Sequence, residues 1–309
     1  MLTLYGSVNK PPIDLNCSMM QLSMKYRCEL MIAGSLLVML LATAQSSADD
    51  GVVVHRNVPY IDSGDLKHEA DIYVPPGEGP FPGVLMIHGG AWTSGTKGHM
   101  LAHARTVVAA GYTVMNINYR LAPKDKFPAQ VDDCKAAVRF MRTNAAKYKI
   151  DPERIASYGY SAGGHLACML GTTDADDGLD GDVADDAPDP RVQCVIAGGA
   201  PCEFRLMPKR ISALGYWLGG SRSDVPENYR LASPTAFATA DDPPVFFFHG
   251  EEDKLVPLES PKSLQAALES HGIECRFHVV EGKGHIGAFL DREPAKEAVK
   301  FLDAVLKGR

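Results

Sequence analysis

The sequence predicts an α/β fold with a mostly parallel central sheet and helices on both of its faces. Strand-like apolar runs alternate with segments of helical periodicity along most of the chain, which is the order of β-α-β units. The runs at 83–88 and 245–249 are almost continuously apolar, as in strands with both faces covered. The chain has 309 residues, of which 45% are hydrophobic, so it is large enough for one such domain.

The expected elements follow one another along the chain. The predicted strands are 52–54, 69–74, 83–88, 112–117, 154–158, 192–197, 245–249 and 274–280. The predicted helices are 100–110, 129–147, 162–170, 260–270 and 294–306. The P-P-G sequence at 75–77 marks a turn after a strand, and Pro128 suits the start of a helix. Asp151 followed by Pro152 predicts another turn, just before the strand at 154–158.

Two segments break the alternation of strands and helices. The segment 172–191 contains eight Asp residues but lacks the layout of an EF-hand, so we expect a solvated loop rather than a calcium site. The segment 203–234 is irregular and lies between two strands, and we expect it to form a small lid-like insertion. Its Tyr216 and Trp217 could equally contact a substrate or pack in a core.

Residues 1–48 are predicted to be an N-terminal extension with a signal peptide, followed by one folded domain at 49–309. Lys25 and Arg27 precede an apolar run at 30–44, and small residues lead from this run to Ala48. This is the order of a secretory signal, and the run is shorter than the roughly 20 residues of a membrane-spanning helix. We therefore expect a secreted or periplasmic protein with no stable membrane anchor after cleavage.

Charge and cysteine content argue against several classes of protein. The formal net charge is −7 and no basic stripe is present, so nucleic acid is not an expected partner. The cysteines beyond residue 48 have spacings that match neither a zinc site nor a disulfide scaffold. One disulfide is possible if the protein resides in an oxidising compartment. Cys194 and Cys202 are the nearest pair along the chain. No metal and no cofactor are expected.

The sharpest functional motif is G-Y-S-A-G at 159–163. It fits the G-x-S-x-G nucleophile elbow, in which a strand turns abruptly into a helix and exposes a serine hydroxyl. Flanking glycines tolerate the crowded and strained backbone that this turn needs. A predicted strand precedes the motif and a predicted helix follows it, so we expect Ser161 to be a nucleophile.

A second motif, H-G-G-A-W at 88–92, directly follows a predicted strand. A loop of this kind offers backbone N–H groups to the negative charge that develops on a carbonyl oxygen. We expect the N–H groups of Gly90 and Ala91 to form this oxyanion hole together with that of Ala162, which follows the nucleophile. Gly89 is the neighbouring candidate if the register is shifted by one residue. The flanking histidine and tryptophan are expected to be structural.

Asp253 and His285 are the predicted partners of Ser161. Asp253 lies in H-G-E-E-D-K-L-V-P, and His285 lies in G-K-G-H. Each follows a predicted strand, and open α/β sheets place their sites at the carboxyl ends of strands. His285 would take the proton of the serine, and Asp253 would hold the imidazole in the right tautomer.

Other side chains compete for these two roles. Glu251 and Glu252 follow the strand so closely that they have little reach. Asp241 and Asp242 precede the strand and so lie at the wrong end of the sheet. A structural role is expected for the remaining candidate histidines, His165, His249, His271 and His278.

With these residues in view, the chain resembles the esterase and lipase branch of the α/β-hydrolases. N-Y-R-L-A-P at 118–123 and F-P-A-Q-V-D-D at 127–133 are similar to further landmarks of that branch. The hormone-sensitive-lipase group carries H-G-G-G and G-D-S-A-G-G, whereas Ala91 and Tyr160 stand at the differing positions here. The chain is thus more similar to bacterial bifunctional feruloyl and acetyl-xylan esterases. The resemblance implies an α/β-hydrolase fold and hydrolysis of acyl groups on plant-type polysaccharides.

The leading prediction is a serine carboxylic-ester hydrolase that acts through an acyl-enzyme on small or carbohydrate-linked esters, of acetyl or feruloyl type. The same triad cleaves amides, so a serine peptidase or amidase is the alternative among enzymes. A non-catalytic binding protein on the same fold is the other class, although such proteins usually lose a triad member. The fold alone does not decide between these functions.

Overall fold

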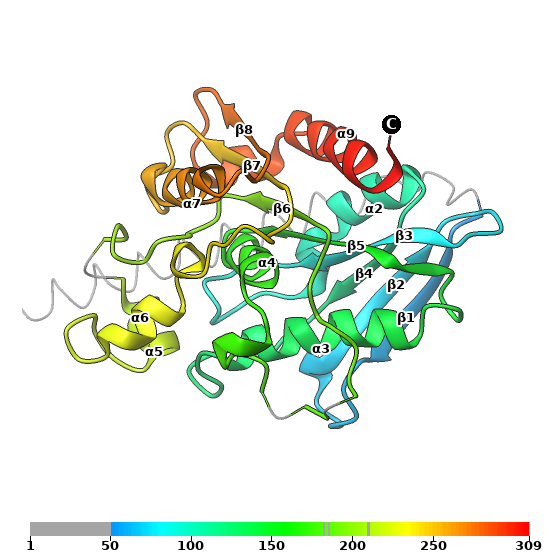
Figure 1. Cartoon of the computed structure of the whole chain (residues 1–309), viewed down its shortest axis with the longest axis horizontal. Coiled ribbons are helices and arrows are strands. Elements are labelled where there is room, and N and C mark those ends of the chain that lie inside the picture. Colours follow the sequence, from blue (N-terminus) through cyan, green and yellow to red (C-terminus); the bar gives the residue numbers. More distant parts are fainter. Residues whose placement is uncertain (1–50, 182, 185, 209–210, 309) are drawn as a thin grey trace, which may run out of the picture. The chain divides into compact units, whose positions relative to one another are not determined.

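An eight-stranded, mostly parallel sheet runs through the molecule (Figure 1). The computed structural model describes residues 51–308 except 182, 185, 209 and 210, so the predicted signal peptide lies outside the described residues. The strand order is β1-β2-β4-β3-β5-β6-β7-β8; β2 pairs antiparallel with β1 and β4, and the other pairs are parallel. The strands are β1 (Val53–Pro59), β2 (Glu69–Val74), β3 (Phe81–Ile87), β4 (Thr113–Ile117), β5 (Ile150–Tyr160), β6 (Cys194–Gly198), β7 (Val245–Gly250) and β8 (Cys275–Val280).

Helices cover both faces of the sheet, as predicted. One face carries α2 (Leu101–Ala109) and α9 (Glu293–Lys307), and the other carries α3 (Ala129–Thr143), α4 (Ala162–Thr172) and α7 (Glu259–Ser270). The sequence did not predict three further helices, α5 (Ser212–Leu218), α6 (Pro226–Leu231) and α8 (His285–Leu290). Each has only six or seven residues, too few for a helical period to be recognised. No helix in the described part is both long and apolar enough to cross a bilayer.

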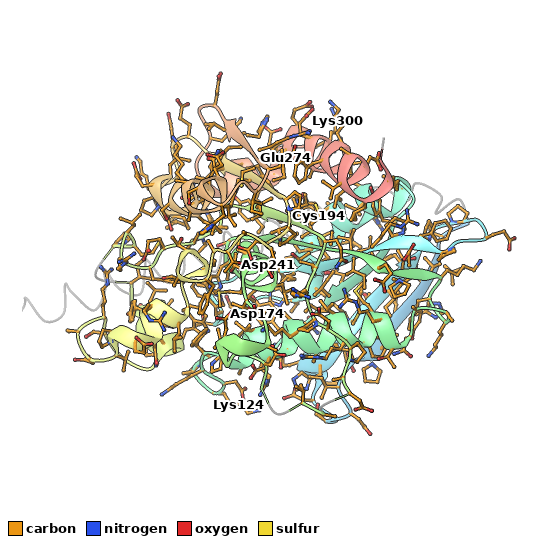
Figure 2. The ribbon with its side chains drawn as sticks, viewed as in Figure 1. Lys124, Asp174, Cys194, Asp241, Glu274 and Lys300 are labelled. Carbon is orange, nitrogen blue, oxygen red and sulfur yellow. The ribbon has the colours of Figure 1, made fainter. Side chains whose placement is uncertain are left out.

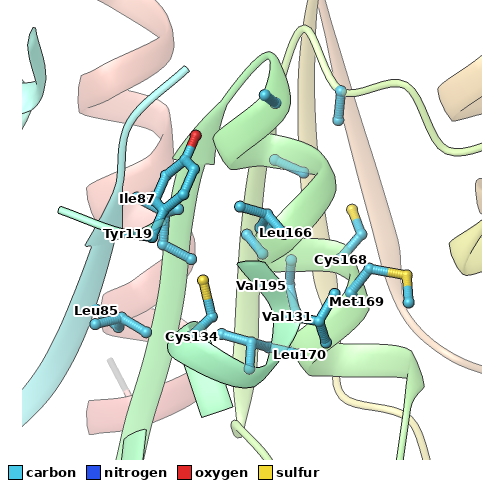
Figure 3. Packing of buried hydrophobic residues seen from close by; sticks show 14 of the residues in the cluster. Leu85, Ile87, Tyr119, Val131, Cys134, Leu166, Cys168, Met169, Leu170 and Val195 are labelled. Carbon is cyan, nitrogen blue, oxygen red and sulfur yellow. The ribbon is translucent and has the colours of Figure 1, made fainter. Parts of the chain in front are cut away.

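Strand β3 is apolar throughout because both of its faces are buried. Val84 and Met86 belong to a core cluster with residues of α2 and α9. Leu85 and Ile87 belong to the cluster on the opposite face. Figure 3 shows part of this second cluster, including Val131, Leu166, Leu170 and Val195. Burial of each such side chain contributes roughly 1.5–3 kcal/mol, so the sheet holds its helices on two sides.

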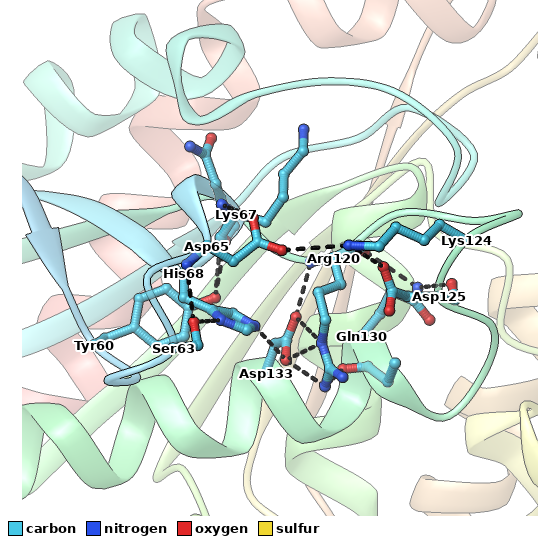
Figure 4. Close-up of polar contacts among 12 residues, drawn as sticks. Tyr60, Ser63, Asp65, Lys67, His68, Arg120, Lys124, Asp125, Gln130 and Asp133 are labelled. Atoms are coloured by element: carbon cyan, nitrogen blue, oxygen red, sulfur yellow. Dashed lines mark hydrogen bonds and ion pairs between the residues drawn. The ribbon is translucent and has the colours of Figure 1, made fainter.

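The two stretches at 118–123 and 127–133 meet in a polar network on the α3 side of the sheet (Figure 4). Arg120 donates through its backbone N–H and its Nε to the carboxylate of Asp133, at 2.8 and 2.9 Å. His68 Nε2 lies 3.2 Å from the same carboxylate. Because Asp133 is fully buried, these donors are needed to satisfy its charge.

Three predicted elements have clearly different bounds. Strand β1 runs to Pro59, five residues beyond the predicted end at 54. Strand β5 begins at Ile150, four residues before the predicted start, and the turn predicted at Asp151 and Pro152 is a bulge within this strand, where Asp151 Oδ1 accepts from the Glu153 N–H at 3.0 Å. Asp151 pairs with Pro82 on β3, and the register of the two strands is irregular just beyond this pair. A proline is accepted in a sheet at such an irregularity because no ladder N–H is required there. Helix α3 ends at Thr143, four residues before the predicted end.

The described cysteines are all free. Figure 2 shows Cys194 in the interior, where it is fully buried on β6. The two thiols in contact are those of Cys168 and Cys202, with their Sγ atoms 3.9 Å apart. The nearest pair along the sequence is therefore not the pair that folding brings together.

Candidate active site

Ser161 lies at a sharp turn between the end of β5 and the start of α4. Its backbone has φ 57° and ψ −121°, a strained conformation for a residue that carries a side chain. The turn is also crowded, because a Cβ atom added to Gly163 would overlap the carbonyl oxygen of Ile87 on β3. The glycine at this position of the motif is thus required by a close backbone approach.

The structure brings the three predicted triad residues together at the carboxyl ends of parallel strands. Asp253 follows β7, and His285 is the first residue of α8, which follows β8. His285 Nε2 lies 2.9 Å from Ser161 Oγ, and His285 Nδ1 lies 2.5 Å from Asp253 Oδ2. Because the carboxylate can only accept a hydrogen bond, the ring proton lies on Nδ1. The lone pair of Nε2 therefore faces the hydroxyl of Ser161. This geometry lets the imidazole accept the proton of Ser161.

Three N–H donors and the nearby ring of His249 surround the buried carboxylate of Asp253. The backbone N–H groups of Leu255 and Val256 each donate to Oδ1 at 2.9 Å, and His285 donates to Oδ2. His249 Nε2 donates to the Val256 carbonyl at 2.9 Å and lies 3.3 Å from Oδ2. Burial alone raises the pKa of Asp253, but its hydrogen bond with His285, the charge of that residue and the Val256 N–H outweigh burial, so the pKa lies below its ordinary value. The carboxylate therefore stays charged into acidic solution.

The H-G-G-A-W loop lies against the elbow. A Cβ atom added to Gly89 would lie 2.8 Å from the Tyr160 carbonyl oxygen and 3.2 Å from Ser161 Cβ, so glycine is needed for this approach. Ala91 has φ 52°, which bends the loop sharply at this point. Ala162 is the first residue of α4, and an N–H at that position has no acceptor within its own helix. The four expected donors therefore stay candidates for the oxyanion hole, and which of them bind an oxyanion stays a prediction.

Several of the competing acids and histidines have other partners. Glu251 accepts a hydrogen bond from a backbone N–H, and Asp241 and Asp242 accept bonds within the turn ahead of β7. His165 is fully buried and accepts a hydrogen bond from Trp92 Nε1. Burial lowers the pKa of His165 to about 3, so this histidine is a neutral structural residue, as expected.

The segment 203–234 is anchored by an aromatic stack. Trp217 on α5 is fully buried, and its ring lies parallel to that of Trp92 with a centroid distance of 3.9 Å. Its Nε1 donates to Gln130 Oε1 at 2.8 Å. Tyr216 is 59% exposed. Trp217 and Trp92 are therefore packing residues, and Tyr216 is the aromatic residue of the pair that is free to contact a ligand. A lid function for this segment stays a prediction.

Two residues beside the triad were not predicted to contact it. Sequence reasoning gave His249 only a structural role and gave Tyr160 none, yet the Tyr160 hydroxyl bonds the main chain of His285. The signals that could have indicated them are positional. Tyr160 directly precedes Ser161, and His249 lies four residues before Asp253.

Comparison with known proteins relates the whole domain to esterases. Esterase LipQ of Mycobacterium tuberculosis is 30% identical over 82% of this chain and 62% of its own length. Esterase LipC of the same organism is 29% identical over 74% of this chain and 60% of its own length. The chain thus spans about three fifths of the length of these curated relatives.

Solved structures give the same relation at the level of the fold. A truncated form of a carbohydrate esterase from gut microbiota superimposes with a TM-score of 0.77 and 27% identity, covering 84% of this chain and 99% of that chain. An acetyl ester-xyloside bifunctional hydrolase from Caldicellulosiruptor lactoaceticus superimposes with a TM-score of 0.70 and 24% identity. The match covers 82% of this chain and 98% of that chain. These likenesses and the sheet topology confirm the predicted α/β-hydrolase fold.

The family assignment rests on the greater part of the domain. The profile of the BD-FAE family matches residues 70–268, which include the predicted oxyanion loop, the nucleophile elbow and Asp253. The matched stretch is more than half of the chain. The chain therefore belongs to the BD-FAE family.

Proposed function

We propose that the protein is a serine carboxylic-ester hydrolase that works through an acyl-enzyme. One observation carries the proposal: Ser161, His285 and Asp253 form a continuous hydrogen-bonded chain from hydroxyl to carboxylate. A serine hydroxyl is a weak nucleophile until a neighbouring base can take its proton. Membership of the BD-FAE family and the similarity to named esterases support an ester as the substrate.

In the first half-reaction, Ser161 Oγ forms a bond to the carbonyl carbon of the ester while its proton passes to His285 Nε2. The N–H groups of Gly90, Ala91 and Ala162 bind the oxyanion that results. The intermediate then breaks its bond to the alcohol oxygen, and His285 returns the proton to this leaving group. Asp253 orients the ring and stabilises the imidazolium without taking a proton.

In the second half-reaction, water replaces the alcohol. The imidazole of His285 removes a proton from the water as its oxygen bonds to the acyl carbon. Collapse of this second intermediate breaks the bond to Ser161 Oγ, and the proton on His285 passes back to the serine. The products are one carboxylic acid, one alcohol and the free enzyme.

The substrates that we propose are small or carbohydrate-linked esters of acetyl or feruloyl type. Similarity to a carbohydrate esterase at 27% identity supports this class. We also propose that the protein is exported, because the sequence at 25–48 has the order of a signal peptide. Amino-terminal sequencing of the protein from its native host tests the export, and an intact residue 1 would contradict it.

The serine carries the decisive test. Ser161→Ala should lower kcat/KM for p-nitrophenyl acetate by about 10³-fold or more, because the covalent step is lost. Ser263→Ala on α7, an element that carries no site residue, is the matched control and should leave turnover unchanged. Near-normal hydrolysis by Ser161→Ala would end the proposal.

A substrate panel separates the classes of reaction. We expect hydrolysis of p-nitrophenyl acetate, acetylated xylan or methyl ferulate to exceed that of a peptide p-nitroanilide by several orders of magnitude. A faster reaction with the anilide would indicate a peptidase or amidase instead. An absence of turnover with both kinds of substrate would indicate a binding protein.

A further inference from the structure

Tyr160 links the strand that presents the nucleophile to the helix that presents the base. It is the last residue of β5, directly before Ser161. Its hydroxyl donates to the main-chain carbonyl of His285 at 2.5 Å. His285 Nε2 in turn lies 2.9 Å from Ser161 Oγ. The three residues thus close a ring of contacts: the peptide bond from Tyr160 to Ser161, the phenol bond to His285, and the bond from the imidazole back to the serine.

The side chain of Tyr160 is held on several sides. Its ring centroid lies 5.6 Å from that of Phe248 on β7 and 4.8 Å from that of Phe289 on α8. The imidazole of His285 is the third aromatic neighbour, at 5.2 Å. A Cβ atom added to Gly199 would lie 2.8 Å from Tyr160 Cζ and 3.0 Å from His285 Cε1, so both rings pack on the same piece of main chain. The phenol has little freedom to turn away from its acceptor.

The phenol of Tyr160 is a hydrogen-bond donor at neutral pH. Tyr160 is 4% exposed, and burial, together with the negative charge of Asp253, raises its pKa far above the ordinary value. It therefore keeps its proton at neutral pH, and the main-chain carbonyl of His285 faces this donor. The base itself begins a helix of only six residues, α8, which is too short to be rigid without contacts to the rest of the fold.

We propose that Tyr160 is a positioning residue that fixes the main chain of His285, so that the imidazole reaches Ser161 and Asp253 at once. The inference rests on the proposed esterase function and adds a residue to it. In the hormone-sensitive-lipase motif an aspartate stands at this position, and here a phenol bonded to the base's own backbone takes its place.

The test removes a single oxygen atom. Tyr160→Phe keeps the ring and its aromatic contacts but cannot donate to His285. The chain offers a matched control in Tyr158→Phe, two residues earlier on the same strand. Tyr158 is also buried, and its hydroxyl bonds His103 Nδ1 at 2.9 Å rather than a triad residue. Both variants lose one buried phenol hydrogen bond, so their loss of thermal stability should be similar.

The two variants should differ in catalysis. We expect Tyr160→Phe to lower kcat about tenfold with KM changed less than about twofold, because a misplaced base slows chemistry rather than substrate binding. Tyr158→Phe should keep the wild-type kcat. Titration of the active sites with a fluorophosphonate normalises each rate to the folded fraction. A wild-type kcat in Tyr160→Phe, or an equal loss of kcat in Tyr158→Phe, would overturn the proposal.

A second measurement separates this inference from the proposed function. The rate constant of Ser161 phosphonylation by a fluorophosphonate needs the base but no ester substrate. It should fall about tenfold in Tyr160→Phe and stay unchanged in Tyr158→Phe. If the wild type reacts with the fluorophosphonate but hydrolyses no ester, the proposed function fails while the role of Tyr160 is still decided. Equal rate constants in wild type and Tyr160→Phe would refute that role.

Discussion

Two aspartates show how individual neighbours decide the charge of a carboxyl group in this protein. Asp253 is surrounded by N–H donors, and its pKa lies below the ordinary value. Asp132 on α3 has one buried oxygen, Oδ1, without a hydrogen-bond partner among the described residues. Burial raises the pKa of Asp132 from 3.8 to about 6, and the nearby Asp133 and Asp180 add to the rise. The same functional group is thus stabilised as an anion at one site and penalised as an anion at the other.

The penalty on Asp132 predicts a stabilising substitution. Because its folded pKa exceeds its unfolded pKa, ionisation costs stability fully above about pH 6, and the cost disappears as pH falls towards 3.8. Asp132→Asn should therefore raise the free energy of unfolding at pH 7 by somewhat less than about 1 kcal/mol, after allowing for solvent screening of this partly exposed group. Urea unfolding at pH 7 and pH 4.5 measures this difference.

The pH dependence distinguishes this cause from a general effect of the substitution. The gain from Asp132→Asn should be smaller at pH 4.5 than at pH 7. Asp62→Asn, at an exposed aspartate, is the control and should change stability little at either pH. A gain that is equal at both pH values would mean that ionisation of Asp132 is not its source.

At the scale of elements, α3 binds the acidic segment at Asp180 and Asp174. Lys135 Nζ and Arg139 Nη2 each lie 2.5 Å from an oxygen of Asp180. The side chain of Lys135 is fully buried, and its ammonium group also donates to the Asp174 carbonyl. Both oxygens of Asp180 are thus taken by cations of the protein. We expected a solvated loop, and most of its described residues are partly or fully exposed; Asp180 departs from this expectation, because it forms ion pairs with a helix.

Substitutions of Lys135 and Asp180 should have strongly non-additive effects on the free energy of unfolding. We expect Lys135→Met to lower the free energy of unfolding by roughly 3 kcal/mol, since it leaves Asp180 partly unpaired. Asp180→Asn should cost a similar amount, because a buried ammonium then lacks its partner. The double variant should cost clearly less than the sum, with a coupling energy of about 1–3 kcal/mol in urea unfolding. Strict additivity of the two single substitutions would contradict the coupling.

Sequence periodicity was informative for long elements and silent for short ones. The two faces of a buried strand and the amphipathic face of α9 leave a pattern in the sequence, so β3, β7, α7 and α9 were predicted to within two residues at each end. Helices α5, α6 and α8 complete fewer than two turns. Their stability comes from tertiary contacts such as the stack of Trp217 on Trp92, which no local pattern contains.

At the scale of the whole molecule, parallel pairing explains why the site was predictable. Ser161, Asp253 and His285 are far apart in sequence, but all follow strands that run in the same direction. Their meeting at one sheet edge follows from topology alone. The contacts of Tyr160 and His249 follow from side-chain packing between β5, β7 and α8, and this packing exists only once the sheet has formed.

The position of β8 at the border of the sheet has a consequence for heat inactivation. This strand pairs with β7 on one side only. Five of its six residues are partly or fully exposed, and His285 lies five residues after its end. Edge strands fray before central ones. On heating, turnover should therefore be lost several degrees below the midpoint of thermal unfolding that far-ultraviolet circular dichroism reports. Amide hydrogens of β8 should also exchange faster than those of β5. If the midpoints of inactivation and unfolding coincide, and the amide hydrogens of β8 and β5 exchange at equal rates, the edge strand is as stable as the central one.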